Sequence, residues 1–200
     1  MEYSIPMAII DFVPVILFAW AAIILQRVLY YKMSKGAFAL FATGTIDIIC
    51  AGVAKATYKL LYAAGICDFT ALNNMFFPVQ SIGFLLAGLG VFAMIFFKQK
   101  KDVLLSAGVP VFSGTLLFVG LMVGGLAIMY LGLSVLARRL KKPGIVILLA
   151  VSFVCMLGMG YLSSRDCNSA VVNWMAEGVN IVGQGTFLIS AVMFKRCDIS

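Results

Sequence analysis

Three hydrogen-bonding side chains lie on one face of the last apolar stretch of this sequence. Glu177, Asn180 and Gln184 follow one another at intervals of three and four residues, a spacing that places them in one stripe along a helix. A charged side chain within hydrocarbon costs roughly 2.5–3.5 kcal/mol, so it usually faces other helices and has a partner. The stripe therefore predicts either hydrogen bonds that hold helices together or the wall of a path for a small polar solute or ion.

Lys59 is the partner that the sequence suggests for Glu177. Lys59 stands eight residues before Cys67, and Glu177 stands ten residues after Cys167. If both cysteines mark the same membrane surface, the two charged side chains lie at similar depth, roughly 12 Å in. An ion pair between them is then expected, whereas it is lost if the two cysteines mark opposite surfaces.

Two other polar residues are candidates for the same path. Asp47 lies twelve residues after Lys35, roughly 18 Å along a helix and thus close to the midplane. It is either a cation or proton site or a protonated acid without a role. Gln80 occupies the place of Asn180 in a second copy of the pattern, described below. Asp11 lies nearer the end of its apolar stretch and is expected at the membrane interface.

The sequence excludes most familiar catalytic and metal chemistry. There is no histidine among the 200 residues, which rules out Ser-His and Cys-His pairs and imidazole metal sites. The five cysteines contain no CxxC, so neither a zinc knuckle nor a redox pair is indicated. We therefore expect no metal, no cofactor and no enzymatic activity. Cys67 and Cys167 could form a disulfide if both face an oxidising exterior, whereas Cys50 and Cys155 are expected to be small buried residues.

The elements that position these residues are predicted to be membrane-spanning helices. Hydrophobic residues make up 63% of the chain and charged residues 12%, against about half and a quarter in soluble domains. Basic residues cluster where the apolar segments end, which indicates cytoplasmic loops and not nucleic-acid binding. The expected location is the cell membrane, with the N-terminus outside and the C-terminus cytoplasmic. Six segments are long enough for helices: 6–31, 37–63, 75–97, 103–137, 144–163 and 170–194.

The segment 103–137 crosses the membrane either once or twice. As one helix its thirty-five residues would span roughly 52 Å, too long for a hydrocarbon core about 30 Å thick. A single crossing divides the basic residues eight against seven between the two sides, whereas two crossings leave only Lys55, Lys59 and Arg165 outside. The second division is the one that the positive-inside rule predicts. With a turn near residues 120–125, the chain is an all-α bundle of seven transmembrane helices in a three, one, three order; the alternative is six helices as two inverted repeats of three.

An internal repeat appears at an offset of one hundred residues. CDFTALNNMFFPVQSIG (67–83) and CNSAVVNWMAEGVNIVG (167–183) agree at five of seventeen positions, which predicts a duplicated three-helix unit over approximately 6–97 and 110–196. The three, one, three order resembles the layout of sugar-exporting carriers of the PQ-loop type. Their Pro-Gln signature is absent from the first helix of either unit, so the likeness is one of layout and no family follows from it.

The predicted function is a small carrier or channel-like protein that moves a small polar solute or ion. Its path runs between the repeats and is lined by Asp47, Gln80, Glu177, Asn180 and Gln184. The alternative is a membrane-embedded sensor or an accessory subunit of a larger membrane complex. The expected partners are the lipid bilayer and the solute or ion, and the sequence leaves open a homodimer or a partner membrane subunit.

Overall fold

Every regular element in the described part of the chain is an α-helix. The computed structural model describes residues 4–96, 115–164 and 170–198. The helices are α1 (Ile5–Ile10), α2 (Phe12–Leu29), α3 (Lys35–Ala63), α4 (Thr70–Phe96), α5 (Thr115–Arg139), α6 (Pro143–Ser164) and α7 (Ala170–Asp198). Because α1 and α2 continue one another, these ranges hold six long helices, and all but α7 are long and apolar enough to cross a membrane. The all-helical class predicted from the sequence is confirmed, and the length and composition of five of these helices fit the predicted membrane protein.

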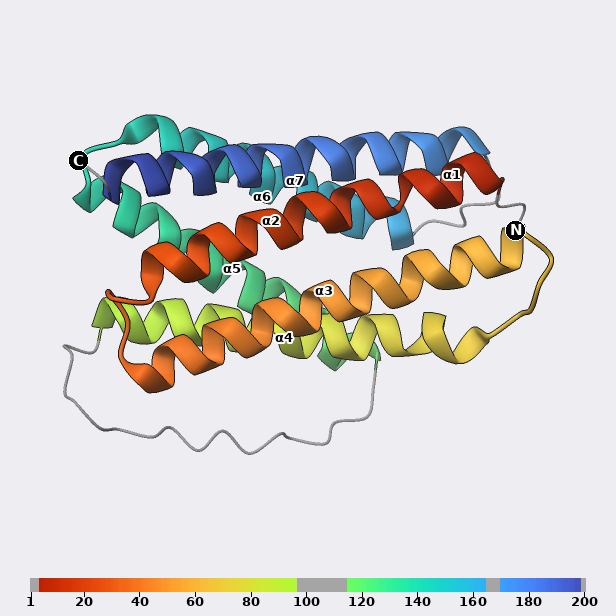
Figure 1. The fold of residues 1–200 in the computed structure, drawn as a ribbon, viewed down its shortest axis with the longest axis horizontal. Helices are drawn as coiled ribbons and strands as arrows, with labels where there is room; N and C mark the ends of the chain where they lie inside the picture. Colours follow the sequence, from red (N-terminus) through yellow and green to blue (C-terminus); the bar gives the residue numbers. More distant parts are fainter. Residues whose placement is uncertain (1–3, 97–114, 165–169, 199–200) are drawn as a thin grey trace.

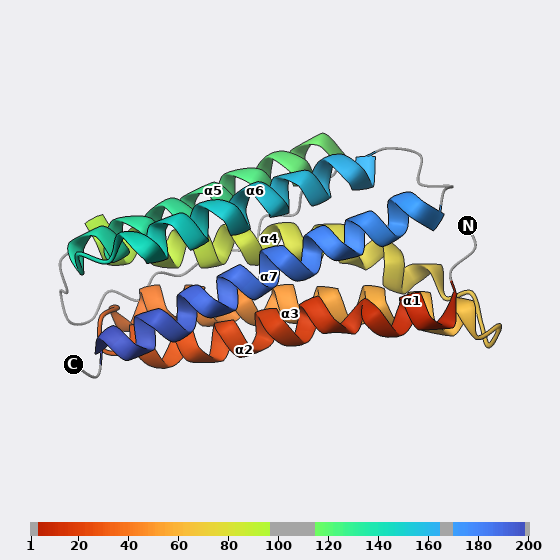
Figure 2. The same cartoon turned by 90° about the horizontal axis from the view of Figure 1, so that it is seen from above.

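The helices form a closed ring that follows their order along the chain. Each long helix packs against the next, from α2 to α7, and α7 packs back against α2. Figures 1 and 2 show that all of them lie roughly along one axis, so the bundle is elongated. The first residues of α1 and the last residues of α7 lie at opposite ends of this axis.

Helices α4 and α5 run in the same direction. Gly125 of α5 lies against Phe84 and Leu85 of α4, and about two turns later Gly132 lies against Val91 and Ile95. Helices α5, α6 and α7 therefore repeat the directions of α2, α3 and α4, as both views show. The alternative of two inverted repeats, which requires opposite directions, is wrong.

The expected turn near residues 120–125 is also wrong. Helix α5 runs without a break from Thr115 to Arg139, because a run of large apolar residues on both sides of the glycines keeps the helix intact. Only twelve charge-free residues, 103–114, precede it, fewer than the roughly 20 of a usual helical crossing. Residues 97–114 lie outside the described part of the chain.

The helix boundaries have local causes. Pro14 has no N–H to donate to Ile10, and its ring conflicts with that carbonyl, which explains why the first span breaks between α1 and α2 at Asp11. The Ser34 side chain accepts a hydrogen bond from the Ala37 amide and caps the start of α3. Gly65, with φ of 65°, ends α3 in the left-handed conformation that glycine adopts most easily.

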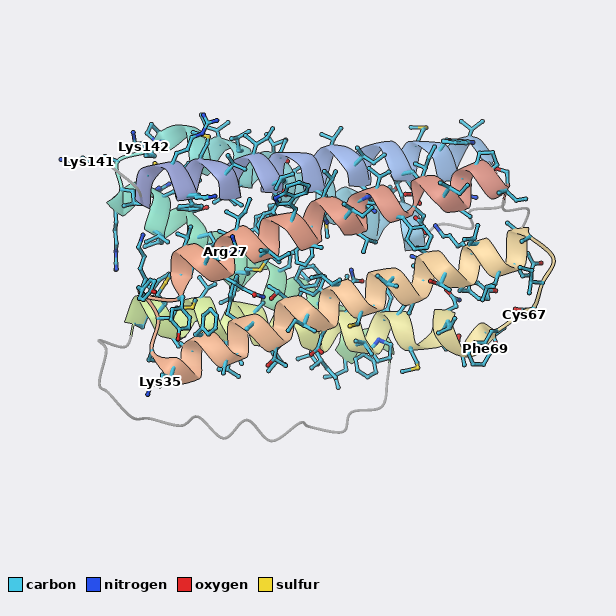
Figure 3. All side chains as sticks on the ribbon, in the orientation of Figure 1. Arg27, Lys35, Cys67, Phe69, Lys141 and Lys142 are labelled. Atoms are coloured by element: carbon cyan, nitrogen blue, oxygen red, sulfur yellow. The ribbon has the colours of Figure 1, made fainter. Side chains whose placement is uncertain are left out.

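The hydrophobic core and most of the positive charge occupy the same half of the bundle. The core is formed by residues 18–29 and 33–48 and by the corresponding end of each other long helix. Figure 3 shows Arg27, Lys35, Lys141 and Lys142 at this end, and Cys67 at the other. Of the eleven basic residues in the described ranges, only Lys55 and Lys59 lie towards the other end. The remaining nine are Arg27, Lys32, Lys35, Arg138, Arg139, Lys141, Lys142, Lys195 and Arg196.

Several glycines in the half that contains the core permit close approach of neighbouring helices. A Cβ at Gly88 would lie 2.6 Å from the carbonyl oxygen of Gly125, so α4 and α5 can pack backbone to backbone only because both residues are glycine. Gly183 of α7 lies close to α6, since a Cβ at this position would lie 2.9 Å from Cys155. At Gly120 and Gly124 no atom of another helix lies within 4 Å of such a Cβ.

Candidate functional site

Three charged side chains meet inside the half of the bundle that lies away from the basic end. The ammonium nitrogen Nζ of Lys59 lies 2.9 Å from Asp11 Oδ2 and 3.1 Å from Glu177 Oε1. The exposed fractions of the Lys59, Asp11 and Glu177 side chains are 10%, 9% and 5%. We call these three residues the ion cluster. The structure thus brings together Lys59 and Glu177, the two residues that depth matching paired from the sequence.

Three separate spans supply the ion cluster. Asp11 stands at the break between α1 and α2, Lys59 lies one turn before the end of α3, and Glu177 lies two turns into α7. At 1.5 Å per residue, each is roughly 6–11 Å from the end of its helix on that side. The three side chains therefore lie at similar depth, which allows one lysine to reach both acids.

The ion cluster contains two acids and one base. Because both carboxylate oxygens contact the same nitrogen, they lie at most about 6 Å apart. At that separation and an effective dielectric constant of about 20, two carboxylates repel each other by about 3 kcal/mol. The lysine offsets part of this repulsion, and one acidic group remains in excess. A buried site of this composition is suited to taking up a positive charge.

Asp11 belongs to the ion cluster, although the sequence suggested only an interfacial residue at this position. Its side chain is buried, and it makes the shorter of the two contacts with Lys59. The interruption caused by Pro14 places Asp11 between two helical segments, where its carboxylate reaches into the bundle. The depth count that paired Lys59 with Glu177 would have found Asp11 as well, since it lies six residues from the start of α1.

The polar stripe of α7 continues from Glu177 towards the core. Glu177 and Gln184 are buried and Asn180 is half-buried. The Gln184 amide nitrogen donates to Met156 Sδ at 3.1 Å, which orients the amide because a thioether sulfur only accepts. Among the described residues, Glu177 Oε2 and Gln184 Oε1 are buried oxygens without a hydrogen-bond partner. Such atoms are uncommon in proteins and each lies where a donor could bind.

A second polar chain, missed from the sequence, links α5, α6 and α7 beyond Gln184. The hydroxyls of Tyr130 and Ser152 lie 2.7 Å apart, and Ser152 donates to the carbonyl of Gly183 at 2.7 Å. The Tyr130 ring packs against Phe187, which stacks on Phe18 of α2. These aromatic rings fill the bundle between the polar stripe and the basic end. No sequence signal marks Tyr130 or Ser152, because their meeting depends on the relative positions of two helices.

Asp47 and Gln80 lie apart from the α7 stripe. Both are half-buried, on the packed pair α3 and α4. In the described part of the chain no hydrogen bond or ion pair joins either of them to Glu177, Asn180 or Gln184. Of the five residues expected to line a path, the three on α7 therefore lie together beside the ion cluster. Asp47 and Gln80 lie apart from them, on α3 and α4.

The cysteines also differ from expectation in part. Cys50 is exposed and Cys155 is half-buried, so neither is the fully buried small residue that was predicted. Cys67 is an exposed free thiol on the turn between α3 and α4, visible in Figure 3. Cys167 lies outside the described residues, so the disulfide between the two stays a prediction.

Neither metal chemistry nor a known family accounts for the site. The described residues include no group of three or more acidic, cysteine or histidine side chains that could hold a metal ion. Comparison with known proteins gives no match to a family model, to a curated protein or to a solved structure. What bears on function is the chemistry of the ion cluster and of the stripe beside it.

Proposed function

We propose that this chain is an integral membrane carrier that moves a small polar solute or ion past the ion cluster and the α7 stripe. The observation that carries the proposal is the pair of buried oxygens without a hydrogen-bond partner among the described residues, Glu177 Oε2 and Gln184 Oε1, on one face of α7. Both are acceptors, so the complementary solute carries hydrogen-bond donors. Burying acceptors without partners costs about 1–3 kcal/mol each, which is reasonable at a binding site and unexpected in a purely structural bundle.

The ion cluster supports the same proposal. Charged groups inside a membrane bundle usually mark a solute or ion pathway, because they are expensive to bury. Here the cluster and the stripe meet at Glu177, which belongs to both. The carrier would use Lys59 and Asp11 to set the charge of the site, and Glu177, Asn180 and Gln184 to contact the solute.

We also propose that the chain crosses the membrane seven times, with the basic end in the cytoplasm. Helices α4 and α5 are parallel, so if both span the bilayer the chain has to cross once more between them. Nine basic residues at one end are what the positive-inside rule expects of a cytoplasmic face. The N-terminus would then lie outside.

A duplicated three-helix unit is consistent with this arrangement. The offset of one hundred residues pairs Gly83 with Gly183, and each of them packs against the preceding helix, Gly83 on Asp47 and Ile48, Gly183 on Cys155. The two sets of three helices run in the same sense, which suits repeats related by an axis along the membrane normal.

A vesicle assay tests the carrier function. The purified protein is reconstituted into liposomes, and uptake of radiolabelled glycerol, xylose and methylammonium is measured as three donor-bearing probes. For at least one probe, we expect uptake above protein-free vesicles and a loss of about ten- to a hundredfold in Glu177→Ala, because a hydrogen bond to a charged group contributes about 1.5–3 kcal/mol. Gly124→Ala, on an open face of α5, is the matched control and should transport like the unaltered chain. Background uptake of all three probes would contradict the proposal.

Topology is tested by labelling single cysteines in a chain whose five native cysteines are replaced. Lys35→Cys and Lys142→Cys lie at the basic end, and Asp68→Cys at the other. With seven crossings, a membrane-impermeant maleimide added to intact cells labels Asp68→Cys and spares the other two. With six crossings, Lys35→Cys and Lys142→Cys lie on opposite sides, so one of them is labelled.

The second candidate is a sensor or an accessory subunit that does not transport. It is favoured by the aromatic packing of Phe18, Tyr130 and Phe187, which closes the bundle beyond the stripe. Such a protein would show background uptake of all three probes while keeping its fold. The same vesicle experiment therefore separates the two functions.

A further inference from the structure

The ion cluster has a charge imbalance that its own side chains do not resolve. Asp11 and Glu177 both contact Lys59 Nζ, so the fully ionised cluster would carry a net charge of −1. A buried uncompensated charge is strongly unfavourable. We infer that the cluster takes up one proton on Glu177 and is a proton-binding site within the bundle.

Geometry selects Glu177 as the acid that holds the proton. Asp11 makes the shorter contact with Lys59 Nζ, 2.9 Å against 3.1 Å for Glu177. The ammonium charge therefore stabilises the Asp11 carboxylate more strongly. Glu177 is the more buried of the two acids, with a side chain 5% exposed. Its Oε2 is buried and has no hydrogen-bond partner in the described part of the chain. A proton on that oxygen leaves Lys59 and Asp11 as a balanced ion pair.

A proton fits the site better than a metal cation does. The place between the two carboxylates, where a cation would bind, is already taken by the ammonium group of Lys59. Hard cations require about six oxygen ligands. The described residues provide no cluster of three or more side chains of the metal-binding types.

Among the described helices around Glu177, a further charge comes from Lys55, which acts on Asp11 and not on Glu177. Helix α6, which packs against α7, contains no charged residue and only Cys155 and Tyr161 as titratable groups. On α3, Lys55 lies one turn before Lys59 and its Nζ lies 4.1 Å from the centre of the Phe76 ring. Arg27, the charged residue of α2, lies in its last turn at the basic end.

This site defines the coupling ion of the proposed carrier, and that role rests on the proposed function. The oxygen that would hold the proton, Glu177 Oε2, is also one of the two acceptors offered to the solute. One oxygen cannot be protonated and accept a donor from the solute in the same geometry. Arrival of a cationic, donor-bearing solute therefore replaces the proton without changing the charge of the cluster, and solute and proton move in exchange.

Infrared spectroscopy of the full-length protein in lipid nanodiscs at pH 7 tests the proton count. Only a protonated carboxyl group has the carbonyl stretch of a carboxylic acid, and Asp11→Asn/Glu177→Gln serves as the reference for difference spectra. We expect one carboxylic acid in the unaltered chain, none in Glu177→Gln or Asp11→Asn, and two in Lys59→Met. The two neutral variants preserve side-chain shape, so the test stands even if Lys59→Met fails to fold.

Several results would overturn the inference. One is an unaltered chain without the band; another is a band that persists in Glu177→Gln. A carboxylic-acid band that appears only in Lys55→Met would mean that Lys55 balances the second acid. A band that is lost in NaCl but kept in choline chloride would mean that sodium displaces the proton. The spectrum does not depend on transport, so the two proposals can fail separately. One protonated carboxyl group together with background uptake would contradict the carrier and support the proton site. Uptake above background without the carboxylic-acid band would contradict the proton site and support the carrier.

Discussion

Replacing Lys59 by methionine should destabilise the protein in a way that depends on pH. Methionine preserves the length and much of the volume of the side chain but removes the charge, so Asp11 and Glu177 lose their shared partner. The folded variant then has to bind one more proton than the unaltered protein. Protonating an ordinary carboxyl group at pH 7, about three units above its usual pKa near 4, costs about 4 kcal/mol. We expect a loss of that size in the free energy of unfolding.

The pH dependence of this loss follows from proton linkage. The folded variant binds one more proton than the folded unaltered protein, so lowering the pH stabilises the variant relative to it by about 1.4 kcal/mol per unit. The difference of about 4 kcal/mol at pH 7 should therefore shrink to about 1 kcal/mol at pH 5. Reversible unfolding in mixed micelles of SDS and a mild detergent, at several pH values, measures both numbers.

Lys55→Met is the matched control for that experiment. Lys55 lies on the same helix, one turn from Lys59, with its ammonium over the Phe76 ring. Its loss should cost about 1 kcal/mol, the size of a cation–π contact, with a weaker dependence on pH, because Lys55 acts on Asp11 and not on Glu177. A difference for Lys59→Met that stays flat between pH 5 and pH 7, or lies below about 1 kcal/mol at pH 7, would refute the role of Lys59 as the partner of both acids.

Three further substitutions test the packing around the site, each by its effect on the same unfolding measurement. Gly125→Ala places a Cβ 2.5 Å from the Leu85 amide nitrogen and should lower the free energy of unfolding by about 1–3 kcal/mol. Gly124→Ala places a Cβ in open space and should raise it by about 0.5–1 kcal/mol. Equal effects of the two variants would contradict the parallel packing of α4 and α5. Tyr130→Phe removes one hydrogen bond and should cost about 1 kcal/mol. Ser152→Ala leaves both the Tyr130 hydroxyl and the Gly183 carbonyl unpaired and should cost more, about 2 kcal/mol. The reverse order would show that Ser152 does not link Tyr130 to Gly183. Gln184→Leu removes a buried oxygen that has no partner among the described residues. It should stabilise the fold by about 1 kcal/mol and lower the uptake of solute into vesicles. A destabilised variant would mean that Gln184 is structural.

The sequence was sufficient to predict the pairing of Lys59 with Glu177. Distances along apolar segments convert directly into depth, and a buried charge needs a partner at its own depth. The distribution of basic residues likewise indicated which ends lie together, and the described helices have nine of these residues at one end. Both inferences rest on charge and hydropathy, which are constrained along the membrane normal.

Positions around the bundle axis were not predictable in the same way. Asp11 was assigned to the interface, because nothing in the sequence says that a break near Pro14 opens towards Lys59. Gly120 and Gly124 were expected to turn the chain, yet both lie within α5 and face open space, while Gly125 makes a close contact with α4. Glycine is compatible with all of these outcomes, so only the arrangement of the neighbouring helices decides between them.

A charge exchange tests the ion cluster most directly. Lys59→Glu puts three acids in the cluster and Glu177→Lys puts two bases beside one acid, so each single variant should lose most of its folded, monodisperse protein in size-exclusion chromatography. The double variant Lys59→Glu/Glu177→Lys keeps two acids and one base within reach of one another, and it should recover both the folded yield and the thermal midpoint to near those of the unaltered chain. If the double variant is as impaired as the worse single variant, Lys59 and Glu177 do not act as partners inside the membrane.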